Sequence, residues 1–198
     1  MIKAIIFDLG GVLFTNGTKK FIEDISARYN LDKEVVKDIM DGEIGSNYRE
    51  AKITRDEFWK QVLEKLHINE DIDKLEDEWI NGYELIEGTK EIILELAKKY
   101  KVLYLSDNVK ERVERINDKY GFMAWFENGI FSHEAGVRKP NSQIYKLALE
   151  KAGVEAEEAV FIDDKAPFLE PAKEMGMTTF VFQTPKKLKE DLQLNNLL

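Results

Sequence analysis

Residues 5–14 read IIFDLGGVLF, an apolar run that ends at one carboxylate, Asp8, and continues through Gly10 and Gly11. In open parallel sheets, ligands bind beyond the carboxyl ends of the strands, so an acid at such an end is a candidate for chemistry. Glycines beside it let backbone N–H groups approach a ligand without side chains in the way. The stretch therefore predicts a buried strand that leads into a functional site.

Four more short apolar runs accompany this one, and all five are continuous rather than alternating, as in strands covered by helices on both faces. The predicted strands are residues 3–8, 101–106, 129–132, 159–164 and 178–182. Helical patterns precede or separate them at 89–100, 109–121 and 141–153, and Asn108 with Glu111 resembles a capping box. The predicted fold class is α/β, a Rossmann-like parallel sheet sandwiched by helices.

The interval after the first strand holds no convincing strand. Residues 19–30, 31–40, 54–67 and 71–85 have helical spacing, and Thr54 with Glu57 forms a capping box pattern. A simple crossover needs only about a dozen residues, so the interval predicts a separate helical cap. We expect a core of residues 1–14 plus 88–198, and a cap of residues 15–87 with Phe58, Trp59, Trp79 and Tyr83 in its interior.

Composition narrows the possible functions of the 198 residues. A net charge of −9 at pH 7 argues against nucleic-acid binding, which needs a basic face. The chain has no cysteine, which excludes disulfides and zinc–thiolate sites. Its first residues resemble neither a signal peptide nor a membrane span, so we expect a cytoplasmic protein. No pattern in the sequence predicts an oligomeric state.

The strand ends carry one set of polar residues that the parallel sheet would bring to one edge. The set comprises Asp8, Ser106, Asp107, Asn108, Asp163 and Asp164, joined by Lys139 in a loop before a helix. Carboxylates are the ligands that Mg²⁺ prefers, and Mg²⁺ commonly shares its coordination with a phosphate. A carboxylate can also attack phosphorus, while a lysine, a hydroxyl and backbone N–H groups hold the phosphoryl oxygens.

These motifs, in this order, resemble those of the haloacid dehalogenase (HAD) superfamily: FD-x-x-G-x-L, a strand-end Ser106, the lysine of GVRKP, and FIDD. The resemblance spans residues 2–182 and is closest to the subclass with an α-helical C1-type cap and to the branch with a DLGGVL-type first motif. It implies Asp8 as nucleophile, with Asp8, Asp163, Asp164 and the Gly10 carbonyl at Mg²⁺. It also implies phosphate binding by Ser106 and Lys139, with Asp107, Asn108, Gly10 and Gly11 beside them.

One departure from the family pattern concerns Gly10. Phosphatases of the superfamily usually carry a second aspartate at this position as general acid and base, and glycine has no side chain to replace it. We expect a Mg²⁺-dependent hydrolase of small-molecule phosphate monoesters, with sugar phosphates among the candidate substrates. The alternatives are a 2-haloacid dehalogenase, which has no use for the paired acids of FIDD, and a non-catalytic phosphate-binding protein of the same fold.

Overall fold

The five apolar runs form one parallel sheet in the computed structural model, which describes all 198 residues. The order along the sheet is β3-β2-β1-β4-β5. The strands are β1 (Ala4–Phe7), β2 (Lys101–Ser106), β3 (Asn128–Phe131), β4 (Ala159–Asp163) and β5 (Thr178–Val181). The predicted α/β class and the predicted strands are confirmed, with ends that shift by at most one residue.

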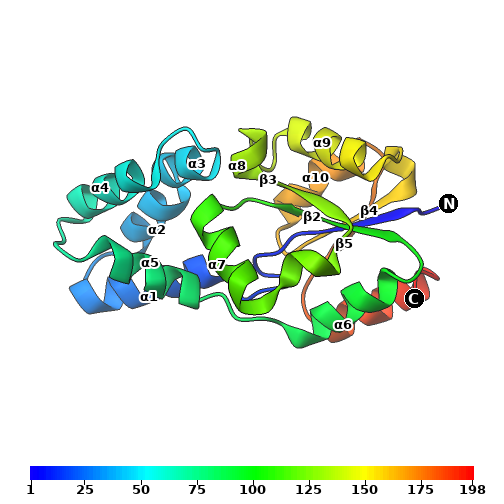
Figure 1. The fold of residues 1–198 in the computed structure, drawn as a ribbon, viewed down its shortest axis with the longest axis horizontal. Helices are drawn as coiled ribbons and strands as arrows, with labels where there is room; N and C mark the ends of the chain where they lie inside the picture. Colours follow the sequence, from blue (N-terminus) through cyan, green and yellow to red (C-terminus); the bar gives the residue numbers. More distant parts are fainter.

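Helices cover both faces of the sheet because successive side chains of a strand point to opposite sides. Ile5 and Phe7 pack in the hydrophobic cluster that contains α6 (Glu87–Leu96), α7 (Lys110–Tyr120) and α11 (Pro185–Leu194). Ala4 and Ile6 pack in a second cluster with α9 (Ser142–Ala152) and α10 (Ala166–Glu174). Figure 1 shows α6 and α9 on opposite sides of the strands. Burial on both faces explains why the strand sequences are continuously apolar.

Five helices follow β1 before the chain returns to the sheet at α6, and they lie together beyond one end of it (Figure 1). They are α1 (Gly17–Tyr29), α2 (Lys33–Asp41), α3 (Glu43–Arg49), α4 (Arg55–Leu66) and α5 (Ile72–Asn81). The predicted capping box at Thr54 and Glu57 is present at the start of α4. Phe58 stacks on Tyr48 and on Trp79 at centroid distances of 4.5 and 5.6 Å, which places the predicted aromatic residues inside this helical part.

The helical part and one face of the sheet share a hydrophobic cluster. Its 39 buried residues include Phe58 and Trp79 of the helical part as well as Phe7 and Val160 of the sheet. The division into a core of residues 1–14 plus 88–198 and a cap of residues 15–87 therefore stays a prediction.

Two local features differ from the sequence-based expectations. No helix was predicted at α3, at α11 or at α10, where Pro167 and Pro171 interrupt the usual helical pattern. The predicted capping box at Asn108 and Glu111 is wrong: Asn108 accepts from Arg112, and Glu111 accepts from Tyr48. None of the helices has the length and apolar character needed to cross a membrane.

We expect Phe58→Ala to destabilise the whole chain, because the cavity it leaves would lie in the shared cluster. The loss should be about 3–5 kcal/mol, seen as one transition by circular dichroism and by tryptophan fluorescence. Leu94→Ala, at a half-exposed site on α6, is the control and should change little. Two separate transitions in the wild type would contradict the shared cluster and favour independent units.

Candidate active site

The strands after β1 lie on both sides of it: β2 and β3 on one side, β4 and β5 on the other. The strand order therefore reverses between β1 and β4. Such a reversal opens a crevice at the carboxyl ends of the strands. Asp8 follows β1 there, Asp163 ends β4, and Asp164 comes next. One carboxylate oxygen from each of the three lies within 4.8 Å of the others. The sheet thus brings together acids that are about 155 residues apart in the sequence.

Lys139 holds two of these acids from the loop before α9. Its Nζ lies 2.9 Å from Asp8 Oδ1 and 2.6 Å from Asp163 Oδ2, and the side chain is only 1% exposed. The backbone N–H of Lys139 donates to Asp107 Oδ1 at 3.0 Å, so Asp107 fixes this loop to the end of β2. Burial raises the pKa of Asp8 to about 6, against the opposing attraction of Lys139. Burial acts to lower the pKa of Lys139, but Asp163, Asp8 and Asp107 raise it overall.

The two adjacent acids at the end of β4, Asp163 and Asp164, have different partners. Asp163 Oδ1 accepts the backbone N–H of Lys165 at 2.8 Å, so together with Lys139 both of its oxygens are engaged. Asp164 Oδ1 is buried and has no hydrogen-bond partner in the protein. A buried carboxylate oxygen without a donor, close to a second carboxylate, is the chemistry that a hard divalent cation satisfies. The residues present therefore fit Mg²⁺ beside Asp8 and Asp164, with Asp163 turned toward Lys139.

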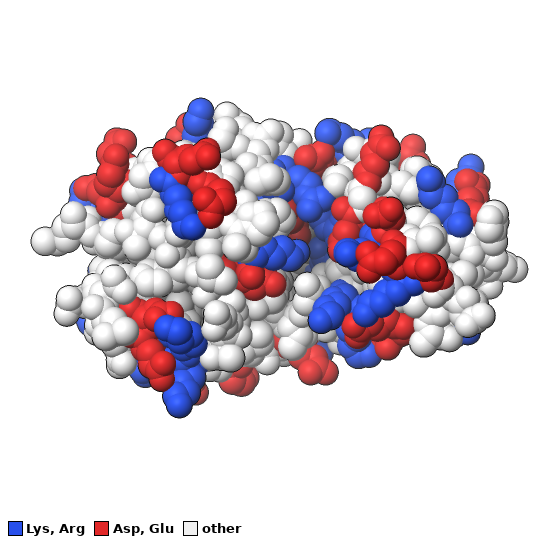
Figure 2. Space-filling model, turned by 180° about the vertical axis from the view of Figure 1, so that it is seen from behind, with Lys and Arg blue, Asp and Glu red and all other residues white.

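A polar cavity of about 140 Å³ opens above these groups. Figure 2 shows Lys and Arg side chains gathered where the surface is indented near the middle of the molecule. The residues that line the cavity are Asp8, Gly10, Asn16, Thr18, Asp41, Arg49, Tyr83, Ser106, Asp107, Asn108, Arg112, Arg138, Lys139, Lys165 and Phe168. The backbone N–H groups of Gly10 and Asp107 make no hydrogen bond within the protein, which leaves them free for an anion.

Gly10 and Gly11 differ in what a side chain would meet. A Cβ at Gly10 would lie 3.8 Å from Tyr83 and otherwise in open space. Gly11 has φ of +92°, and a Cβ there would lie 2.5 Å from Asp164 Oδ2. Gly11 therefore keeps space for the Asp164 carboxylate, whereas Gly10 lines the cavity itself.

The helical part and the core both contribute cavity residues that sequence reasoning missed or placed elsewhere. Tyr83 was predicted in the cap interior, but its hydroxyl also reaches the cavity residues Thr18 and Arg112. Arg138, next to Lys139 in the sequence, contacts Asp107 and donates to Ser46 Oγ at 2.6 Å. Arg49 and Arg112 were not singled out, because nothing in their local sequence distinguishes them from surface arginines.

The family model of haloacid dehalogenase-like hydrolases matches residues 2–176. This chain is a haloacid dehalogenase-like hydrolase. The family assignment agrees with the site, in which Asp8, Ser106 and Lys139 line one cavity and Asp163 and Asp164 lie close to Asp8.

Curated relatives of this hydrolase include two phosphatases. It is 29% identical over 196 residues to glyceraldehyde 3-phosphate phosphatase of Methanocaldococcus jannaschii, covering 90% of this chain and 84% of that one. It is 26% identical over 194 residues to D-ribitol-5-phosphate phosphatase of Bacteroides thetaiotaomicron, covering 91% of each. Both relatives act on small phosphorylated compounds, as their names state.

Among solved structures, the hydrolase resembles HAD family enzyme bt-2542 of Bacteroides thetaiotaomicron. The TM-score is 0.77 at 25% identity, over 92% of this chain and 94% of that one. Another structure of that enzyme, at a TM-score of 0.75 and 23% identity, contains magnesium and inorganic phosphate. The shared fold includes the parallel sheet and the helical part.

The close approach of Gly11 to Asp164 predicts an unequal response to two alanine substitutions. Gly136→Ala introduces only left-handed strain, of about 1–2 kcal/mol, because no atom lies within 4 Å of its Cβ. Gly11→Ala adds the clash with Asp164 and should reduce the free energy of unfolding further. Urea titrations of both variants measure the difference, and equal losses would show that Asp164 moves aside at no cost.

Proposed function

We propose that this hydrolase cleaves small-molecule phosphate monoesters with Mg²⁺, through an aspartyl phosphate formed at Asp8. The observation that carries the proposal is the pairing of Asp8 with Lys139, which both line a polar cavity, close to the buried, unpartnered Oδ1 of Asp164. Such a site combines a carboxylate nucleophile with a cation that offsets its charge.

The chain's own residues would act in two steps. Asp8 attacks the phosphorus, the bond from phosphorus to the ester oxygen breaks, and the ester oxygen leaves as an alkoxide that takes its proton from water. Water then attacks the same phosphorus, which releases phosphate and restores the Asp8 carboxylate. Lys139, the Ser106 hydroxyl and the free N–H groups of Gly10 and Asp107 would hold the phosphoryl oxygens during both steps.

Mg²⁺ would be held by Asp8, Asp164 and the Gly10 carbonyl, with Asp163 behind them on Lys139. It would supply positive charge next to the phosphoryl oxygens and offset repulsion between phosphate and the acids. In this proposal Asp107 and Asn108 contribute mainly as supports, since their side-chain oxygens already accept from Lys139, Arg138 and Arg112.

Two alternatives remain in view. A 2-haloacid dehalogenase would use Asp8 without a metal and would leave the buried Oδ1 of Asp164 unexplained. A non-catalytic protein would bind phosphate and Mg²⁺ but would not turn over. The phosphatase names of the two curated relatives favour hydrolysis of phosphate esters over both.

The decisive experiment measures phosphate release from a panel of phosphate monoesters and halide release from 2-haloacids, each with Mg²⁺ and with EDTA. We expect phosphate release that requires Mg²⁺ and disappears in Asp8→Asn, because an amide cannot act as the nucleophile. The matched control is Asp118→Asn, an exposed aspartate outside the cavity, which should keep full activity. Halide release in EDTA would support the dehalogenase, and Mg²⁺-dependent phosphate binding without turnover would support the non-catalytic protein.

The missing side chain at Gly10 predicts how the rate depends on the leaving group. General acid catalysis is typically worth about 10²–10⁴-fold and matters most for strongly basic alkoxides. We expect kcat/KM to rise steeply as the leaving-group pKa falls, with aryl and anomeric sugar phosphates ahead of glycerol phosphate. Gly10→Asp should flatten this dependence, since its Cβ has room and no left-handed strain. A flat wild-type series would mean that another group already supplies the proton.

A further inference from the structure

Arg112 is a buried cation in the cavity that has no acidic partner. Its side chain comes from α7 and is 2% exposed, yet it forms no salt bridge with any carboxylate of the chain. Two neutral oxygens accept its hydrogen bonds: Asn108 Oδ1 from Nε at 2.5 Å and Tyr83 Oη from Nη1 at 2.9 Å. Arg112 Nη2 makes no hydrogen bond within the protein.

The other cations that line the cavity are already paired or exposed. Arg49 Nη2 lies 2.8 Å from Asp41, Arg138 contacts Asp107, and Lys139 lies between Asp8 and Asp163. Lys165 is exposed to solvent. Burying an unpaired charge is costly, so the charge on Arg112 is the one that the protein alone leaves without compensation.

The surroundings of Arg112 hold its guanidinium in place. Its Cζ lies 4.6 Å from the ring centre of Trp79 and 4.7 Å from that of Tyr83, and both rings attract a cation. Burial lowers the pKa of Arg112, but an arginine stays protonated in proteins. The group is therefore fixed, charged and facing the same cavity as Asp8.

We propose that Arg112 binds a second anionic group of the substrate, separate from the phosphoryl group that Asp8 receives. This inference rests on the proposed function, because it adds a substrate class to it: small phosphate esters that also carry a carboxylate or a second phosphate. Guanidinium groups bind both anions through paired N–H donors. Cavities for drug-sized ligands measure about 300–1,000 Å³, so a cavity of about 140 Å³ suits a substrate of a few carbons.

The test compares binding of phosphoglycolate with its neutral analogue phosphoglycolamide, by calorimetry with Mg²⁺ present, in Asp8→Asn protein that cannot turn them over. We expect phosphoglycolate to bind about ten- to a hundredfold more tightly than the amide. Arg112→Gln in the same background should abolish this preference and leave binding of the amide nearly unchanged. Ethylene glycol bisphosphate is the third probe: tighter binding than phosphoglycolate assigns the second anion as phosphate, and weaker binding assigns it as carboxylate.

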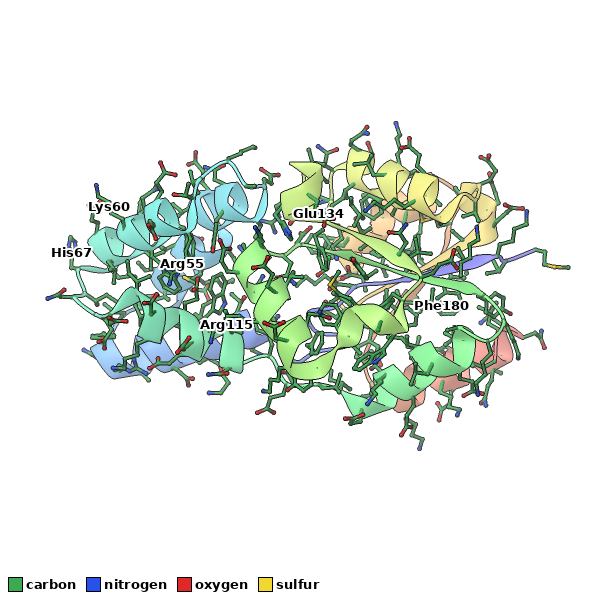
Figure 3. All side chains as sticks on the ribbon, viewed as in Figure 1. Arg55, Lys60, His67, Arg115, Glu134 and Phe180 are labelled. Atoms are coloured by element: carbon green, nitrogen blue, oxygen red, sulfur yellow. The ribbon has the colours of Figure 1, made fainter.

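The matched control is Arg115→Gln on the same helix, labelled in Figure 3, which also faces the helical part through Asp77 but is 41% exposed. It should keep the full preference for phosphoglycolate. If Arg112→Gln does not fold, Arg112→Lys tests the same point, since loss of the planar fork should reduce the preference several-fold.

Three results would overturn the proposal: equal binding of the two probes in Asp8→Asn, a preference that persists without Arg112, or equal weakening of both probes by Arg112→Gln. The last result would make Arg112 only a structural link between α7 and the helical part. Failure of the proposed function looks different, because wild-type protein would then release no phosphate from any ester while the Arg112-dependent preference in binding persisted.

Discussion

The arrangement of the site depends on one buried ion cluster, in which the ammonium of Lys139 lies between the carboxylates of Asp8 and Asp163. These acids end neighbouring parallel strands, so the sheet itself forces two negative charges together where water is largely excluded. Without a cation their mutual repulsion and burial would oppose folding. Lys139 reaches them from the loop before α9, and Asp107 anchors that loop by accepting the Lys139 backbone N–H. The end of β2, the loop before α9 and the β1–β4 crevice therefore form one unit.

The same electrostatic reasoning assigns different roles to Asp163, which ends β4, and Asp164, which follows it. Asp163 is satisfied by Lys139 and a backbone N–H, and it belongs to the support of the site. Asp164 has a buried oxygen without a partner, and Gly11 keeps the space that its carboxylate occupies. Asp164 and Asp8 are therefore the acids whose negative charge one more cation would offset. A divalent ion bound there would stabilise the fold and take part in the chemistry.

The helical part completes the cavity and does more than cover it. Tyr83, just after α5, accepts from Arg112 of α7 and bonds to Thr18 of α1, so one hydrogen-bonded group joins three segments. Asn108, beside the predicted phosphate-binding residues, uses its side-chain oxygen to orient Arg112. Specificity for the part of a substrate remote from phosphorus would then come from both the helical part and the core, because their side chains meet around one small cavity.

The sequence alone determined the parallel α/β sheet, the helical insertion and the acids at the strand ends, because continuous apolar runs, helical periodicity and strand-end position are local patterns. It also predicted that Lys139 joins Asp8, through motif order. Only the tertiary structure decided which acid pairs with the lysine, which glycine faces the cavity, and that Arg112 is buried without a counter-charge. Those properties depend on contacts between residues far apart in the chain, such as Tyr83 with Arg112 and Asp107 with Lys139, and on burial, which a local pattern does not specify.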